Sequence, residues 1–118
     1  MHGTYEANLA MHDCDLMLNV GARFDDRVTG RISGFSPKSE KIHIDIDPSS
    51  VNKNVTADLS IIGDATIVLK MLIAEMKEQS FVPHQRSLTK WWKQIKSWQK
   101  RDCLSFEQGA DAVSYTHL

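Results

Sequence analysis

The chain has 118 residues, of which 42% are apolar and 25% charged, a composition typical of one ordinary globular domain. Its 14 basic and 15 acidic residues leave a net charge of −1, which gives no electrostatic reason to expect a nucleic-acid or anionic-membrane partner. No apolar run reaches the roughly 18 residues of a membrane span, and no signal peptide is visible. We therefore expect a cytoplasmic domain without membrane or nucleic-acid partners, in which Cys14 and Cys103 are reduced thiols.

The first half of the chain predicts a helix, a strand and a long loop. Residues 4–12 favour a short helix that Thr4 caps. The apolar run over residues 15–21 lacks clean alternation and ends at Gly21, as a buried parallel strand does. Residues 22–41 are polar and are expected to form mostly loop with one helical turn. Loops of this length inside compact domains are usually functional or disordered.

A second strand is predicted over residues 41–47, where three isoleucines alternate with His43, Asp45 and Asp47. Asp47 and Pro48 are typical of a helix start, so a short helix is expected to about Lys53. A third strand is predicted over 55–62, followed by a helix over 64–77 capped by Asp64. Strands that alternate with helices predict an α/β fold with a partial Rossmann-like parallel sheet and flanking helices.

The pattern changes after residue 79. A linker over 81–86 precedes an amphipathic helix in which Leu88, Trp91, Trp92, Ile95 and Trp98 recur at helical spacing, with five basic residues between 90 and 101. One interpretation is a nucleic-acid or membrane-surface helix. We favour the other, in which the aromatic stripe packs on its own protein. Residues 112–118 are expected to be a non-native tail produced by sequencing read-through.

The segment GARFDDRVTG, residues 21–30, carries the most chemical information. It follows a predicted strand, where ligands of open α/β sheets bind. Gly21 allows close backbone approach to a ligand, and Arg23 and Arg27 can engage phosphate oxygens in forked geometry. Asp25 and Asp26 can orient these arginines or accept hydrogen bonds from a ligand. The GxGxxG fingerprint is absent, and a solvated charged loop is the alternative interpretation.

Acidic residues recur at the ends of the next two predicted strands. Asp45 is a candidate for binding ribose hydroxyls, whereas Asp47 is better explained as a helix cap. Asp64 follows the third strand, so all three strand ends are expected to converge on one crevice. The histidines show no metal-ligand spacing, and no catalytic set of Ser, His and Asp or of Cys and His can be assembled.

Three stretches of the chain closely resemble the catalytic subunit of the acetolactate synthase (acetohydroxyacid synthase) family. They are MHGTYEAN at residues 1–8, VGARFDDRVTG at 20–30 and IHIDIDPSSVNK at 42–53. The resemblance runs to about Gly109. It implies that residues 1–78 are the second half of a central FAD-binding domain and that 79–111 lead towards a C-terminal domain. A related carboligase, such as a glyoxylate carboligase, and a free-standing nucleotide-binding or nucleic-acid-binding module are the alternatives.

The resemblance implies a cofactor contact for thirteen residues. Met1 and His2 would approach the flavin, and six residues would line the ribityl and pyrophosphate region: Gly21, Ala22, Arg23, Asp25, Arg27 and Val28. Asp45 and Ile46 would meet the adenosine part near Ser50, and Asp64 and Ala65 would hold the adenine end. Arg27 would also lie near the substrate channel of the parent enzyme, where herbicides bind.

The resemblance also implies what lies outside this chain. The parent enzyme uses thiamine diphosphate and Mg²⁺ to join a two-carbon unit from pyruvate to a second pyruvate or to 2-oxobutyrate. The activating glutamate and the diphosphate motif belong to other domains, so we assign no catalytic residue and no metal ligand here. We expect an incomplete unit that is inactive alone. Its parent would be a bacterial homodimer or tetramer with a regulatory small subunit.

Overall fold

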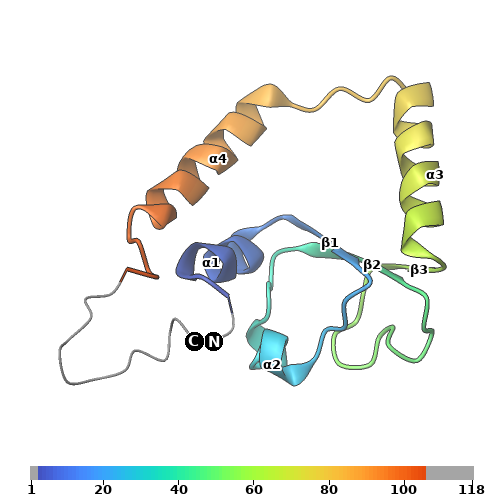
Figure 1. The fold of residues 1–118 in the computed structure, drawn as a ribbon, viewed down its shortest axis with the longest axis horizontal. Helices are drawn as coiled ribbons and strands as arrows, with labels where there is room; N and C mark the ends of the chain where they lie inside the picture. The colour runs from blue at the N-terminus through green and yellow to red at the C-terminus, as the bar shows by residue number, and fades with distance from the viewer. Residues whose placement is uncertain (1–2, 106–118) are drawn as a thin grey trace.

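The computed structural model describes residues 3–105. Met1, His2 and the predicted non-native tail over 112–118 lie outside these residues. The described part contains helix α1 (Tyr5–Asp13), strand β1 (Leu16–Val20), helix α2 (Asp26–Thr29), the 3₁₀ turn η1 (Ile32–Gly34), strands β2 (Glu40–Asp45) and β3 (Leu59–Ile62), and helices α3 (Ala65–Glu78) and α4 (Gln85–Gln99) (Figure 1).

The three strands form a parallel sheet in the order β1-β2-β3. Leu18 pairs with Ile42 across the first ladder, and Ile44 pairs with Ile61 across the second. Along the chain, α1 comes before the first strand, and α3 and α4 come after the last (Figure 1). These observations confirm the predicted α/β fold with a small Rossmann-like sheet. The carboxyl ends of all three strands therefore lie along one edge.

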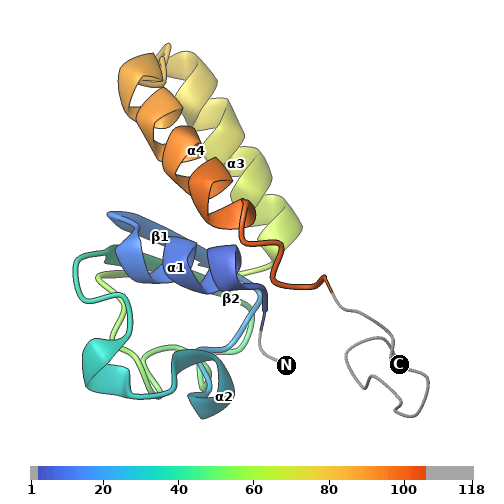
Figure 2. The ribbon, with the colours of Figure 1, turned by 90° about the vertical axis from the view of Figure 1, so that its left-hand side faces the viewer.

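The long polar segment between β1 and β2 is mostly loop with one helical turn, as predicted. That turn is α2, and η1 adds a short 3₁₀ turn. Asp25 caps α2, because its side chain accepts hydrogen bonds from the backbone N–H groups of Arg27 and Val28 at 3.2 Å each. Asp25, which the sequence suggested as a ligand contact, is therefore also the N-cap of α2. Figure 2 shows α2 on the far side of the sheet from α3 and α4.

The predicted short helix after Asp47 is wrong. Residues 47–51 form turns in which the Ser50 and Val51 N–H groups donate to the carbonyl oxygens of Asp47 and Pro48. Asn52 then adopts a φ of 57°, a left-handed conformation that stops further helical turns. The predicted strand over 55–62 is also too long.

Pairing between β2 and the third strand begins only at residue 58. There the Asp58 N–H donates to the Lys41 carbonyl at 2.9 Å, and the Asp58 carboxylate accepts from the Lys41 N–H at 2.7 Å. Val55 and Ala57 are buried but are not part of the ladder. The apolar pattern therefore identified Val55 and Ala57 correctly as buried residues. They are not in a strand because the ladder with β2 includes only Leu59–Ile62 of this segment.

The core of the described residues is small and includes polar groups. Its apolar members are Phe24, Ile44, Val55 and Ala57, and the side chains of His43 and Ser36 are fully buried beside them. Most apolar side chains of α3 are exposed, with Met71 at 67%. At the start of α3, a Cβ on Gly63 would lie only 3.2 Å from Val68, so glycine allows close packing between the strand end and the helix.

Helix α4 lies against α1 at the other end of the molecule from α3 (Figure 1). Trp91, Ile95 and Trp98 are half-buried, and the two tryptophan rings meet edge to face at 5.8 Å. These three residues pack on their own protein as expected. Trp92 does not, because it is 58% exposed beside the neighbouring lysines of the helix.

Candidate functional site

The three strand ends meet as the sequence predicted. The Gly21 N–H, just after β1, donates to the Ile44 carbonyl of β2 at 2.8 Å. The Gly63 N–H, just after β3, donates to the Asp45 carbonyl at 2.9 Å. These two hydrogen bonds tie the first residue of each following loop to the end of the central strand. The loops after β1, β2 and β3 therefore start side by side at one edge of the sheet.

Phe24 anchors the polar loop after β1 in the core. Its side chain is buried, and its ring packs edge to face against Phe35 at 5.8 Å and against His43 at 5.2 Å. The Asn54 side-chain amide donates to the Phe24 carbonyl at 2.8 Å. The loop after β1 is thus fastened both to the sheet and to the loop between β2 and β3.

These two loops enclose a cavity of about 290 Å³. It is lined by Arg23, Phe24, Asp25, Asp26, Arg27, Ser50, Lys53 and Asn54. Within residues 3–105, neither guanidinium of the cavity makes an ion pair with a carboxylate. Both arginines are exposed, so their donors are available to an anionic ligand.

The acidic candidates at the strand ends differ in what their carboxylates do. Asp45 is buried, and one of its oxygens accepts from the Asp47 N–H at 2.8 Å. Asp64 caps α3 by accepting from the N–H groups of Thr66 and Ile67 at 2.9 and 3.1 Å. Both carboxylates therefore already organise backbone, and a ligand would have to use their remaining lone pairs.

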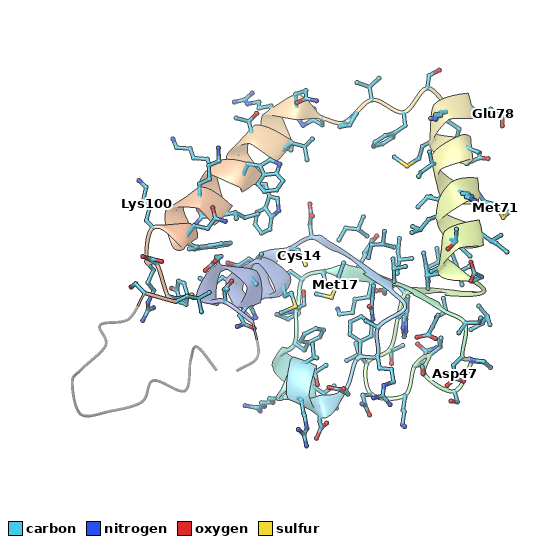
Figure 3. All side chains as sticks on the ribbon, in the orientation of Figure 1. Cys14, Met17, Asp47, Met71, Glu78 and Lys100 are labelled. Atoms are coloured by element: carbon cyan, nitrogen blue, oxygen red, sulfur yellow. The ribbon has the colours of Figure 1, made fainter. Side chains whose placement is uncertain are left out.

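Asp47 caps the turn after β2 rather than a helix. Its carboxylate accepts hydrogen bonds from the backbone N–H and the hydroxyl of Ser49, at 2.9 and 2.8 Å. The Ser49 backbone N–H, followed by its hydroxyl, holds the pKa of Asp47 below its usual range. Figure 3 shows Asp47 in the loop after β2, remote from α1 and α4.

The structure brings most of the predicted cofactor residues to this edge. Arg23, Asp25, Arg27 and Ser50 line the cavity, while Gly21, Ala22 and Asp45 lie at the strand ends. Asp64 and Ala65 lie at the start of α3, beyond β3. Ile46 and Val28 are exposed, at 70% and 48%. Met1 and His2 are outside the described residues.

Sequence reasoning missed four residues that build the site. Lys53 and Asn54 line the cavity from the loop after β2, which the sequence assigned to a helix end. Asn19 and His43 both contact the Ala22 carbonyl. Both are polar residues inside predicted strands, and that was the available signal for this pair.

Two further properties concern metals and membranes. Among the described residues, no group of three or more His, Cys, Asp and Glu side chains is arranged to hold a metal ion. The same part of the chain contains no helix that is both long and apolar enough to span a bilayer. Cys14 and Cys103 are both free thiols.

Comparison with known proteins shows the family to which this chain belongs. A family model described as "Thiamine pyrophosphate enzyme, central domain" matches residues 1–72, more than half of the chain. Acetolactate synthase isozyme 3 large subunit of Escherichia coli is 42% identical over 96% of the chain, and acetolactate synthase large subunit of Cyanidium caldarium is 45% identical over 89%. The chain spans about a fifth of the length of these relatives, 20% and 18%. The chain belongs to the thiamine pyrophosphate enzyme family, with a match to its central domain.

Proposed function

We propose that this chain is the FAD-binding part of the catalytic subunit of an acetolactate synthase. The observation that carries the proposal is the pair of exposed arginines, Arg23 and Arg27, among the residues that line a polar cavity beside the strand ends. Within residues 3–105 no carboxylate neutralises either group. Arginine forks suit the oxygens of a diphosphate, and the carboxyl edge of a parallel sheet is where such ligands bind.

The surrounding residues fit a dinucleotide in a definite order. Gly21 has a φ of 63° and no atom within 4 Å of the place its Cβ would take, so a ligand can approach the backbone there. Asp45 retains carboxylate lone pairs for ribose hydroxyls beyond the one hydrogen bond that it accepts. Asp64 is the N-cap of α3 and Ala65 is its first residue, and we assign the adenine end of the ligand to this helix start. The chain's contribution is binding and orientation.

The parent reaction takes place outside this part of the protein. In the proposed parent, thiamine diphosphate with Mg²⁺ supplies the decarboxylation of pyruvate and the transfer of the two-carbon unit to a second pyruvate or to 2-oxobutyrate. Within residues 3–105, no group of three or more His, Cys, Asp and Glu side chains could hold that metal ion. We further propose a cytoplasmic homodimer or tetramer with a regulatory small subunit as the assembled enzyme.

Titration of the full chain with FAD, followed by quenching of flavin fluorescence, tests the proposal. The variant Arg23→Ala should weaken FAD binding roughly tenfold or more, because a charge-assisted hydrogen bond contributes about 1.5–3 kcal/mol. Arg31→Ala is the matched control, since Arg31 lies on the same connection but donates to Ser33 and does not line the cavity. Failure of the unmodified chain to bind FAD, or equal affinity in both variants, would refute the proposal.

The identity of the parent enzyme is tested separately. Replacing the matching segment of the Escherichia coli isozyme 3 large subunit with residues 1–105 should preserve acetolactate formation from pyruvate, because 96% of this chain aligns with that relative. Activity with glyoxylate in place of pyruvate would favour the alternative parent, a glyoxylate carboligase.

A further inference from the structure

One backbone oxygen at the start of the cofactor loop receives two side-chain donors. The Ala22 carbonyl accepts from the Asn19 side-chain amide at 2.6 Å and from His43 Nε2 at 3.0 Å. Asn19 belongs to β1 and His43 to β2, and the two residues are register partners in the parallel ladder. A cross-strand pair therefore holds the peptide group that immediately precedes Arg23.

The chemistry of this contact assigns a proton to one ring nitrogen of His43. A carbonyl oxygen only accepts hydrogen bonds, so Nε2 must carry the proton. Asp45 Oδ2 lies 3.6 Å from the same nitrogen, which also favours a proton there. His43 Nδ1 is buried and has no partner among the described residues. A bare nitrogen at Nδ1 leaves only an unused lone pair, whereas a proton there would leave a buried donor unsatisfied.

The two hydrogen bonds to the Ala22 carbonyl, from Asn19 and His43, form a clamp on a stretch of backbone that side-chain packing does not fix. Gly21, with its φ of 63°, has no side chain to restrict it, and nothing lies within 4 Å of its missing Cβ. Ala22 and Arg23 are exposed, so packing does not fix them. The next apolar anchor is the buried ring of Phe24, which also packs against the His43 ring at 5.2 Å. His43 thus contacts the loop through both a hydrogen bond and an edge-to-face ring contact.

We propose that Asn19 and His43 form a positioning pair that fixes the Ala22 carbonyl and thereby sets the direction in which Arg23 reaches its anionic ligand. The identity of that ligand, FAD, rests on the proposed function. The pair holds the loop in place before any ligand arrives. His43 does so with a proton on Nε2, and neither residue has to contact the ligand itself.

The first test needs no ligand. Long-range ¹⁵N–¹H NMR spectra of the full chain should show the His43 proton on Nε2, and a proton on Nδ1 alone would overturn the proposal. In ¹⁵N relaxation, the Ala22 and Arg23 amides should have order parameters near the rigid value of about 0.85. In Asn19→Ala and in Asn19→Ala/His43→Leu they should fall towards about 0.6 or below, while Ile44 stays rigid.

Two further variants separate positioning from general packing. His43→Gln keeps an amide donor near the position of Nε2, so it should restore loop order that His43→Leu loses. Met17→Ala trims a half-buried side chain two residues earlier on the same face of β1 and should leave the loop unchanged. The proposal would be overturned if the Ala22 and Arg23 order parameters stayed unchanged in Asn19→Ala. It would also be overturned if they fell as far in Met17→Ala as in Asn19→Ala.

Flavin binding then tests the link to function. Loss of the clamp should weaken FAD binding about tenfold in Asn19→Ala/His43→Leu, with near-normal affinity in His43→Gln. If the loop becomes disordered while FAD affinity stays the same, the pair is not a positioning device for this ligand. If the unmodified chain binds no FAD, the proposed function fails, and the tautomer and order parameters still decide the clamp.

Discussion

Replacement of Gly21 by alanine isolates the role of backbone conformation at the start of the cofactor loop. Gly21 has a φ of 63°, and a Cβ there would meet no atom within 4 Å. The cost of Gly21→Ala is therefore conformational rather than steric, and the left-handed region costs an L-residue roughly 1–2 kcal/mol. Part of this is offset because alanine also restricts the unfolded chain. We expect a net loss of about 1 kcal/mol in the free energy of unfolding.

Gly34→Ala is the matched control for this prediction. Gly34 lies in the same connection between β1 and β2, also has open space around its missing Cβ, and does not have a positive φ. Alanine there should be neutral or should stabilise the chain by about 0.4–1 kcal/mol through the unfolded state. Urea unfolding followed by far-UV circular dichroism measures both, whereas tryptophan fluorescence reports only α4. Equal effects of the two substitutions would refute the reasoning.

Three other predictions use the same unfolding assay. Ile44, in the central strand, is 1% exposed, so Ile44→Ala should lower the free energy of unfolding by about 2–5 kcal/mol. Ile46 is 70% exposed, so Ile46→Ala should lower it little. Similar losses in the two variants would contradict the assigned core. Asp64→Ala should lower the free energy of unfolding by about 1 kcal/mol, because it removes the N-cap of α3. Asn also caps helices, so Asp64→Asn should retain most of that stability. An equal loss in both variants would argue against capping. The lowered pKa of Asp47 should contribute stability that is complete above the ordinary aspartate pKa of about 4 and is lost as the pH falls through the lower folded value. Asp47→Asn should flatten that acid-side dependence, and an unchanged pH profile would contradict it.

The order of the main elements was predictable because it depends on local patterns. The isoleucines of β2 alternate with polar residues, and α1 and α3 are capped by Thr4 and Asp64, residue types that prefer helix caps. Parallel pairing followed from the alternation of strands and helices. The convergence of the strand ends on one edge was a consequence of that topology.

The details of the site depend on contacts that no local pattern contains. The turn over residues 47–51 satisfies the same cap preference at Asp47 that a helix would, and only the left-handed Asn52 distinguishes the two. Lys53 and Asn54 reach the cavity because that turn directs the chain back towards α2. Asn19 and His43 become partners only through the register of β1 and β2. Each of these features needed the three-dimensional arrangement.

The cofactor loop is ordered more by polar contacts than by apolar packing. Between Gly21 and α2 only Phe24 is buried, and the rest of the loop is held by hydrogen bonds from Asn19, His43 and Asn54 to backbone carbonyls. Such bonds each contribute about 1 kcal/mol net, so losing one leaves the fold in place but loosens the loop. Substitutions at Asn19 and Asn54 should therefore change flavin affinity more than global stability, whereas substitution of Ile44 should do the reverse.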